Sequence, residues 1–172
     1  MNYFNSKYFI NNIYVIQKVI QDSKDKMADF EFINDLNETE SLLNIINNKY
    51  VLLDFWATWC LPCRNAVKDL VFLQEFYKSN LLILGVALER GQLSQKIQRL
   101  QRFLFNKSIN YVNFIISDEL KPKLKSCYYG IEYLPLTILV NPEKEIIYKK
   151  EGGDNFLFEI KNTLDKHINN KK

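Results

Sequence analysis

Short apolar runs alternate with amphipathic helical stretches along most of the chain. The runs that predict strands are Tyr50–Trp56, Leu81–Leu88, Tyr111–Ile116 and Leu136–Val140. The stretches that predict helices are Cys60–Lys78, Gln92–Phe105, Asp118–Tyr128 (capped by Ser117 or Asp118) and Asn155–Ile168. Strands that alternate with helices predict a largely parallel sheet with helices on both faces.

Three other segments complete this pattern. Glu145–Lys149 reads as a strand that follows Leu136–Val140 through the short turn Asn141-Pro142-Glu143-Lys144. Because so short a turn can join only antiparallel strands, the predicted sheet is mixed. Asp29–Ile33 alternates weakly and predicts an edge strand, while the apolar spacing within Glu38–Asn47 predicts a helix.

The first 27 residues are interpreted as an extension of a domain that spans residues 28–172. Phe9, Ile13, Ile16 and Ile20 fall on one helical stripe, which predicts an amphipathic helix packed on the domain. A weak export signal and a membrane-surface helix are the alternatives. Polar residues interrupt the apolar run, and no small-residue cleavage site follows it, so a clear secretory signal is not predicted.

Composition narrows the chemistry. The chain has 172 residues, and 23 Lys and Arg against 20 Asp and Glu give a net charge of +3, too weakly basic to indicate nucleic-acid binding. Three cysteines and the single His167 lack the spacing of a zinc site, and His167 lies in a lysine-rich tail, away from any catalytic partner. With five glycines and no phosphate-binding loop, we expect neither a metal nor an organic cofactor.

The strongest chemical signal is Trp59-Cys60-Leu61-Pro62-Cys63, where a buried strand runs into a helix. Cys60 stands at the helix N-terminus, where free N–H groups and the helix dipole stabilise a thiolate. Pro62 is tolerated in the first turn, and Cys63 lies one turn further on, within bridging reach but on the protected face. We therefore expect Cys60 to attack a disulfide and Cys63 to resolve the product.

This segment, with Asp54-Phe55-Trp56-Ala57 before it, closely resembles the active site of the thioredoxin superfamily. The resemblance covers about Ala28 to Ile168. The helix and strand between Leu88 and Ser117, and the motif Gly130-Ile131-Glu132-Tyr133-Leu134-Pro135-Leu136-Thr137, are similar to the TlpA/ResA-like branch. The resemblance implies a thioredoxin-like α/β fold with a helix-strand insertion, and the activity of a thiol-disulfide oxidoreductase.

The resemblance also implies roles for residues outside the cysteine pair. Pro135 would be a cis-proline that faces the disulfide, and Leu134 and Trp59 would contact a bound substrate; a trans proline at a strand start is the alternative. Asp54 would be a buried carboxylate that takes the proton of Cys63. The alternative is a structural aspartate at a strand end that hydrogen-bonds only to the backbone. Many TlpA-like proteins have Asn at this position.

Other parts of the family pattern differ or carry weaker signals. Thioredoxins pair the buried carboxylate with a lysine on the next strand, yet Leu81–Leu88 contains none. Gly152 would match a family glycine beside the site. Arg64 is interpreted as a surface helix residue, and Cys127 as a buried, unreactive thiol.

The implied partners are disulfide-containing proteins and a separate thiol reductant, with reduction favoured over oxidation because the Leu-Pro spacer resembles that of reducing members. Two alternative functions are a redox-silent docking module and a peroxiredoxin-like peroxidase. A peroxiredoxin needs a peroxidatic cysteine in a loop upstream of this site, but here Ala57 and Thr58 precede Trp59, which argues against the peroxidase. We expect a monomer. The absence of a clear signal predicts a cytoplasmic protein, and the family resemblance the cell envelope.

Overall fold

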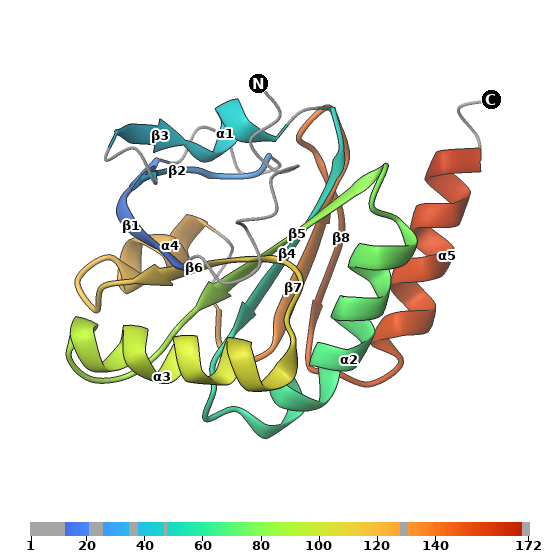
Figure 1. Cartoon of the computed structure of the whole chain (residues 1–172). Helices are drawn as coiled ribbons and strands as arrows, with labels where there is room; N and C mark the ends of the chain where they lie inside the picture. Colours follow the sequence, from blue (N-terminus) through green and yellow to red (C-terminus); the bar gives the residue numbers. More distant parts are fainter. Residues whose placement is uncertain (1–12, 21–25, 35–37, 47, 128–130, 170–172) are drawn as a thin grey trace.

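The computed structural model describes residues 13–20, 26–34, 38–46, 48–127 and 131–169, which form one mixed eight-stranded sheet flanked by helices (Figure 1). The strands are β1 (Ile13–Ile20), β2 (Asp29–Ile33), β3 (Thr39–Ser41), β4 (Tyr50–Trp56), β5 (Leu81–Ala87), β6 (Val112–Ile116), β7 (Leu136–Val140) and β8 (Ile146–Glu151). The helices are α1 (Leu42–Ile45), α2 (Leu61–Phe76), α3 (Leu93–Lys107), α4 (Lys121–Cys127) and α5 (Phe156–Asn169). The predicted α/β fold class is confirmed.

The strand order is β3-β2-β1-β6-β5-β4-β7-β8. Strands β1, β6, β5 and β4 run parallel to one another. The outer pairings are antiparallel: β7 with β4 and β8, and β2 with β1 and β3. The predicted turn joins β7 to β8, with the N–H of Lys144 donating to the carbonyl of Asn141 over 2.9 Å. In this order β4 lies between β5 and β7. The carboxyl end of β4 therefore lies between the loop that follows β5 and the loop that precedes β7.

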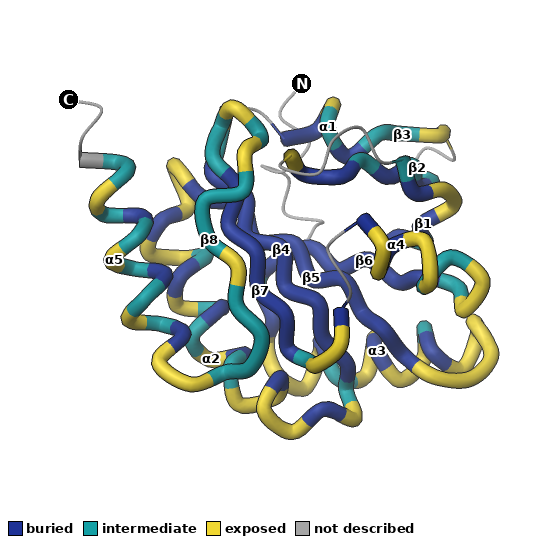
Figure 2. The backbone as a smooth tube through the Cα atoms, turned by 180° about the vertical axis from the view of Figure 1, so that it is seen from behind, coloured by how far each residue is buried: buried dark blue, intermediate teal, exposed yellow. Residues whose placement is uncertain are grey.

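Two apolar cores cover the two faces of the sheet. One core lies on the face of the sheet that α2, α3 and α5 cover. There Leu70, Leu100 and Ile160 of these helices pack against side chains of β4 and β5. The other gathers α1, α4 and the aromatic residues of β2 and β6 on the far face. Strands β4 to β7 are buried along their whole length, as the continuous dark tube at the centre of Figure 2 shows. Burial on both faces explains their nearly unbroken apolar sequences.

The helix predicted through Ile13, Ile16 and Ile20 is wrong, because these residues belong to β1. Strand β1 pairs with β6 on one side and β2 on the other, and a bulge interrupts its register between Ile16 and Lys18. The bulge brings Ile16 and Val19, three residues apart, into the same core. A strand with one bulge therefore imitates helical spacing. Phe9 lies outside the described residues.

Three further elements differ from their predictions. Strand β2 is not at the edge, because β3 covers it. The helix predicted in Glu38–Asn47 is reduced to the single turn α1, because Asp29 accepts hydrogen bonds from the Ser41 hydroxyl and the Leu43 N–H and holds this segment against β2. Helix α4 begins at Lys121, later than predicted, and Asp118 makes ion pairs instead of a cap.

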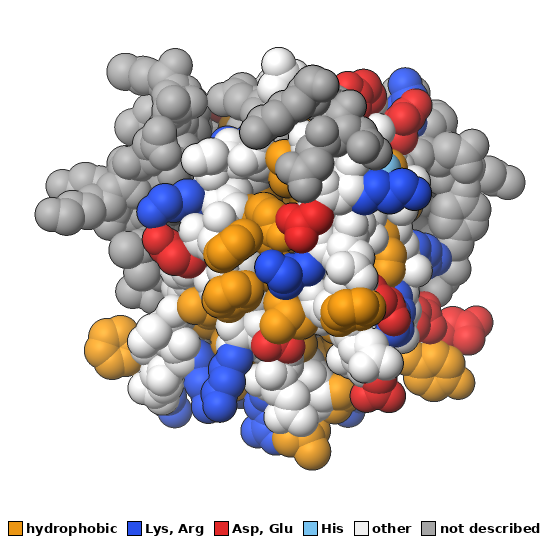
Figure 3. Space-filling view, turned by 90° about the vertical axis from the view of Figure 1, so that its right-hand side faces the viewer, with side chains coloured by type: hydrophobic (Ala, Val, Ile, Leu, Met, Phe, Trp, Pro, Cys, Tyr) orange, Lys and Arg blue, Asp and Glu red, His pale blue; other side chains and the backbone are white. Residues whose placement is uncertain are grey.

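The outer face of α2 and α5 carries a small aromatic cluster. The rings of Phe72 and Phe76 stack with centroids 5.5 Å apart, and both side chains are largely exposed. The Lys161 ammonium lies 4.5 Å from the centroid of Phe76. Figure 3 shows this side of the molecule, where hydrophobic and charged side chains are interspersed. The face is therefore amphipathic.

No helix in the described part of the chain is both long enough and apolar enough to cross a membrane.

Candidate active site

Cys60 and Cys63 form a disulfide, with Cα atoms 5.3 Å apart, at the point where β4 leads into α2. Cys60 is the N-cap of α2, and its sulfur accepts the backbone N–H of Cys63 over 3.2 Å. Pro62 occupies the first turn, where a missing N–H costs no helical hydrogen bond. The predicted local arrangement of the cysteine pair is present.

The two cysteines are buried to different degrees. Cys60 is 6% exposed and Cys63 only 1% exposed. Cys60 is therefore the less buried residue of the pair, and it caps the N-terminus of a 16-residue helix whose dipole favours negative charge. This supports Cys60 as the attacking group and Cys63 as the protected one.

Two loops, one before β7 and one after β8, lie at the end of the sheet where β4 leads to the cysteine pair. The Leu134–Pro135 peptide bond is cis, and the register of Leu136 with Phe55 places Pro135 at the carboxyl end of β4. The N–H of Gly152 donates to the carbonyl of Pro135 over 2.8 Å. A Cβ built on Gly153 would lie 3.8 Å from the Pro62 carbonyl, in ordinary contact. The structure thus brings the proline loop and the Gly152–Gly153 loop together beside the cysteine pair, while Gly130 lies outside the described residues.

Asp54 is buried on β4, on the same side of the strand as Trp56, in the core that also holds Cys63. Removal from water raises the pKa of its carboxyl group to about 7. Its partner in register on β5 is Gly85, so that strand places no lysine side chain at this position. A carboxyl group with this pKa can release and accept a proton near neutral pH.

The two tryptophans have different environments. Trp56 is buried, and its indole N–H donates to Oδ1 of Asn113 over 3.1 Å. Trp59 is 47% exposed beside Cys60, and the Arg90 guanidinium lies 4.2 Å from the centroid of its ring. Trp59 therefore forms part of the surface next to the disulfide, with a cation stacked on it.

Glu89 is a site residue that sequence reasoning missed. It follows β5, its side chain is fully buried, and Oε1 accepts the backbone N–H of Thr58 in the loop before Cys60 over 2.5 Å. Nε of Arg99, on α3, lies 3.5 Å from Oε2. A carboxylate directly after a buried strand, at the sheet edge that bears the cysteines, was the signal that could have found it.

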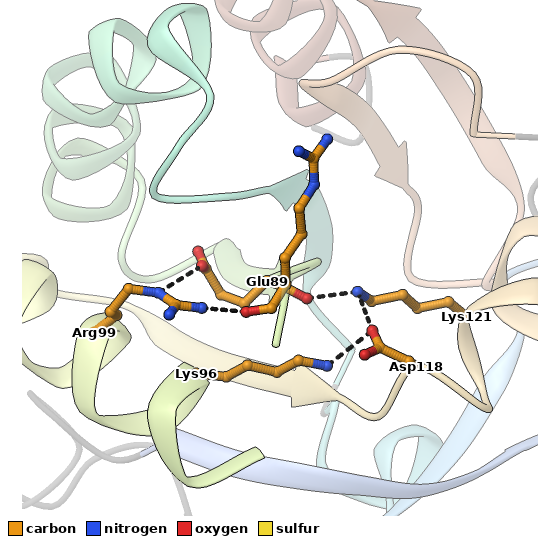
Figure 4. A network of polar contacts seen from close by, with 6 residues as sticks. Glu89, Lys96, Arg99, Asp118 and Lys121 are labelled. Atoms are coloured by element: carbon orange, nitrogen blue, oxygen red, sulfur yellow. Dashed lines mark hydrogen bonds and ion pairs between the residues drawn. The ribbon is translucent and has the colours of Figure 1, made fainter. Parts of the chain in front are cut away.

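Figure 4 shows that Glu89 is part of a larger polar network between β5, α3 and the start of α4. Arg99 also donates to the carbonyl of Arg90, and Lys121 donates to the carbonyl of Glu89. Asp118 pairs with Lys121 and, over 2.9 Å, with the almost fully buried Lys96. Hydrogen bonds from Lys121 and Lys96 lower the pKa of the Asp118 carboxyl group to about 2. The network connects the inserted helix α3 to the active-site loop.

The remaining two residues singled out in the sequence lie apart from this chemistry. Cys127 is a free cysteine buried in the core on the opposite face of the sheet from the disulfide. Burial raises the pKa of its thiol, which disfavours the reactive thiolate. Arg64 is exposed on the first turns of α2.

The fold and the cysteine pair define a thioredoxin-like protein. The chain belongs to the AhpC/TSA family, which residues 23–149 match. It is 25% identical over 115 residues to thiol-disulfide oxidoreductase ResA of Bacillus subtilis (strain 168), covering 67% of this chain and 60% of that protein. It is 29% identical over 121 residues to ResA of Halalkalibacterium halodurans, covering 70% of this chain and 64% of that protein. The matched region is therefore less than two thirds of each relative.

Solved structures confirm the fold. A thiol:disulfide interchange protein from Bacteroides sp. superposes with a TM-score of 0.66 at 23% identity, over 87% of this chain and 91% of that one. A thiol-disulfide oxidoreductase from Bacteroides fragilis superposes with a TM-score of 0.64 at 24% identity, over 80% and 98%. At these identities the likeness concerns the arrangement of the backbone.

Proposed function

We propose that this protein is a thiol-disulfide oxidoreductase that reduces disulfides in protein substrates. The observation that carries the proposal is the Cys60–Cys63 disulfide at the N-terminus of α2, with cis-Pro135 at the neighbouring strand end. The similarity to proteins named thiol-disulfide oxidoreductases supports it.

The reaction begins with the reduced protein. The Cys60 thiolate attacks one sulfur of the substrate disulfide, so a Cys60–substrate bond forms and the other substrate sulfur leaves as a thiolate. Cys63, after losing its proton, attacks the Cys60 sulfur and releases the second substrate thiolate. Two electrons pass to the substrate, and the Cys60–Cys63 disulfide remains until a separate thiol reductant reduces it.

Asp54 has the role of base in the second step. Its carboxyl group lies buried in the core that holds Cys63, and its pKa of about 7 suits proton transfer near neutral pH. Trp59, Leu134 and Pro135 provide the surface on which the substrate segment lies during the exchange. No metal or organic cofactor takes part in this scheme.

Replacing each cysteine tests the assignment. Cys60→Ser should abolish reduction of a disulfide-bonded protein such as insulin, whereas Cys63→Ser should accumulate a mixed disulfide detectable by mass spectrometry. Cys127→Ser is the matched control and should keep wild-type turnover. Turnover by Cys60→Ser, or a mixed disulfide through Cys127, would overturn the assigned roles.

The reduction potential decides the direction of electron flow. Fluorescence of Trp59 can report the state of the disulfide in graded thiol/disulfide buffers, because this side chain adjoins Cys60. A potential at or below about −250 mV supports a reductase, and a value near −120 mV makes the protein an oxidant. If no redox transition is observed and thiol counting confirms this, the oxidoreductase is rejected and the redox-silent docking module is favoured. Consumption of peroxide by the reduced protein would favour the peroxidase.

A further inference from the structure

A groove lies between the first turns of α2, which follow Cys60, and the end of α3. It encloses about 560 Å³ and is lined by Leu61, Arg64, Asn65, Lys68, Phe103 and Lys107. Figure 1 shows how the end of α3 approaches the beginning of α2. Leu61 directly follows Cys60 in the chain, so the groove begins one residue from the cysteine that we propose as the attacking group.

The charges that line this groove are all positive. Arg64 and Lys68 lie one turn apart on α2, and Lys107 is the last residue of α3. None of these three forms an ion pair with another residue in the described ranges, whereas Lys96, Arg99 and Lys121 are paired with Glu89 or Asp118. Asp69 follows Lys68 in the chain; burial raises the pKa of its carboxyl group, and the charge of Lys68 acts to lower it. The three cations give the groove a positive field, which Asp69 offsets in part at Lys68.

The same groove has apolar surface between the cations. Leu61 is 58% exposed, although it is a leucine beside a reactive centre. Phe103 is half-buried and packs against Trp56, with ring centroids 5.3 Å apart, so one wall of the groove is anchored to the core. An apolar wall with a cationic rim fits a polypeptide segment in which carboxylates flank an apolar side chain.

We propose that this groove binds an acidic segment of the substrate protein, next to the disulfide that Cys60 attacks. The proposal rests on the proposed function and adds a substrate class to it. Carboxylates of the segment would pair with Arg64, Lys68 and Lys107, and an apolar side chain between them would cover Leu61 and Phe103. Such complementarity raises the rate of encounter more than the rate of sulfur exchange, and salt weakens it.

Two short peptides test this directly. Each carries one cysteine activated as a 2-pyridyl disulfide, an uncharged leaving group; in one the cysteine is flanked by Glu-Leu-Glu, in the other by Lys-Leu-Lys. The readout is the ratio of their second-order rate constants with the reduced protein. At low ionic strength we expect the acidic peptide to react at least about tenfold faster, with the ratio falling toward one as salt is added.

A charge-reversed variant locates the effect. Lys68→Glu/Lys107→Glu should lower the ratio to one or invert it; the ratio cancels any change in the intrinsic reactivity of Cys60. The matched control is Lys123→Glu/Lys125→Glu, an equal charge change on α4, which should keep the wild-type ratio. Equal rates for both peptides in the wild type, or a ratio that the groove variant does not change, would overturn the proposal.

The proposed function has its own readout in the same experiment. If uncharged 2,2′-dipyridyl disulfide is reduced through Cys60 while the peptides react equally, only the groove proposal fails. If the reduced protein releases no 2-thiopyridone from any of these reagents, the oxidoreductase itself fails.

Discussion

The buried carboxylate of Glu89 accepts the backbone N–H of Thr58, two residues before the reactive Cys60. Through this hydrogen bond the end of β5 holds the loop that carries Trp59. Arg99 on α3 stands on the other side of the same carboxylate. The inserted helix is thereby coupled to the active-site loop, although more than thirty residues separate Arg99 from Cys63 in the chain.

Removing the Glu89 carboxylate should loosen this loop. Glu89→Ala leaves the Thr58 N–H without its acceptor and Arg99 without its partner, which we expect to cost about 1–3 kcal/mol of unfolding free energy. Hydrogen exchange at the Thr58 amide should accelerate. Glu89→Gln keeps an acceptor oxygen and should preserve most of the protection. Equal exchange in the wild type and both variants would show that Glu89 does not hold the loop.

Asp54→Asn should slow the resolving step and remove its pH dependence near neutrality. In the mechanism proposed above the ionised carboxylate is the base, so the rate of Cys63 attack on a preformed mixed disulfide should rise as pH passes through about 7. Asn cannot take the proton, so its profile should lack this rise. Single-turnover release of the substrate thiol measures the step, and an unchanged profile in the variant would remove Asp54 from the mechanism.

The same carboxyl group should make stability depend on pH. The unfolded chain loses this proton near pH 3.8, while the folded protein keeps it to about pH 7. Rising pH between these values therefore favours unfolding, by on the order of 4 kcal/mol in total, and the stabilisation is complete below pH 3.8. Denaturant titrations of the oxidised protein at pH 5 and pH 8 should show about 2–3 kcal/mol of this total, which Asp54→Asn should reduce.

Gly85→Ala should destabilise the protein, whereas Gly153→Ala should not. A Cβ at Gly85 would come within 2.2 Å of Asn113 Oδ1 and 2.9 Å of Trp56 Nε1, so it would disrupt the buried hydrogen bond between them. We expect a loss of about 1–3 kcal/mol. At Gly153 the nearest atom is 3.8 Å away. Thermal unfolding of both variants tests the contrast, and similar melting temperatures would contradict it.

Asp118→Asn should destabilise the start of α3, because it leaves the buried ammonium of Lys96 without its carboxylate. Since the Asp118 side chain is 59% exposed, solvent can partly replace it, and we expect a loss of about 1–2 kcal/mol. Lys96→Met/Asp118→Asn should recover part of the loss. Glu119→Gln, an exposed neighbour, is the control. A double variant less stable than Asp118→Asn would refute this explanation.

Local pattern alone predicted the centre of the fold and the reactive pair. The boundaries of β4 follow from a nearly unbroken apolar run, and the start of α2 from Cys60 and Pro62 at a helix N-terminus. These features need only neighbouring residues, since the strand period and the requirements of the first helical turn are local. The resemblance added Asp54, which is buried on β4, and Pro135, which follows a cis peptide bond at the start of β7.

Tertiary structure decided the rest. Whether Ile13–Ile20 is helix or strand depends on β6 and β2, which supply the hydrogen bonds of β1 and absorb its bulge. The contact of Glu89 with Thr58 and Arg99 exists because β5 lies beside β4 and α3 folds back across their carboxyl ends. Likewise, only the placement of α3 in the fold brings Lys107 to the groove that Lys68 lines. Such contacts join residues far apart in the chain, and strand order, which no local pattern encodes, determines them.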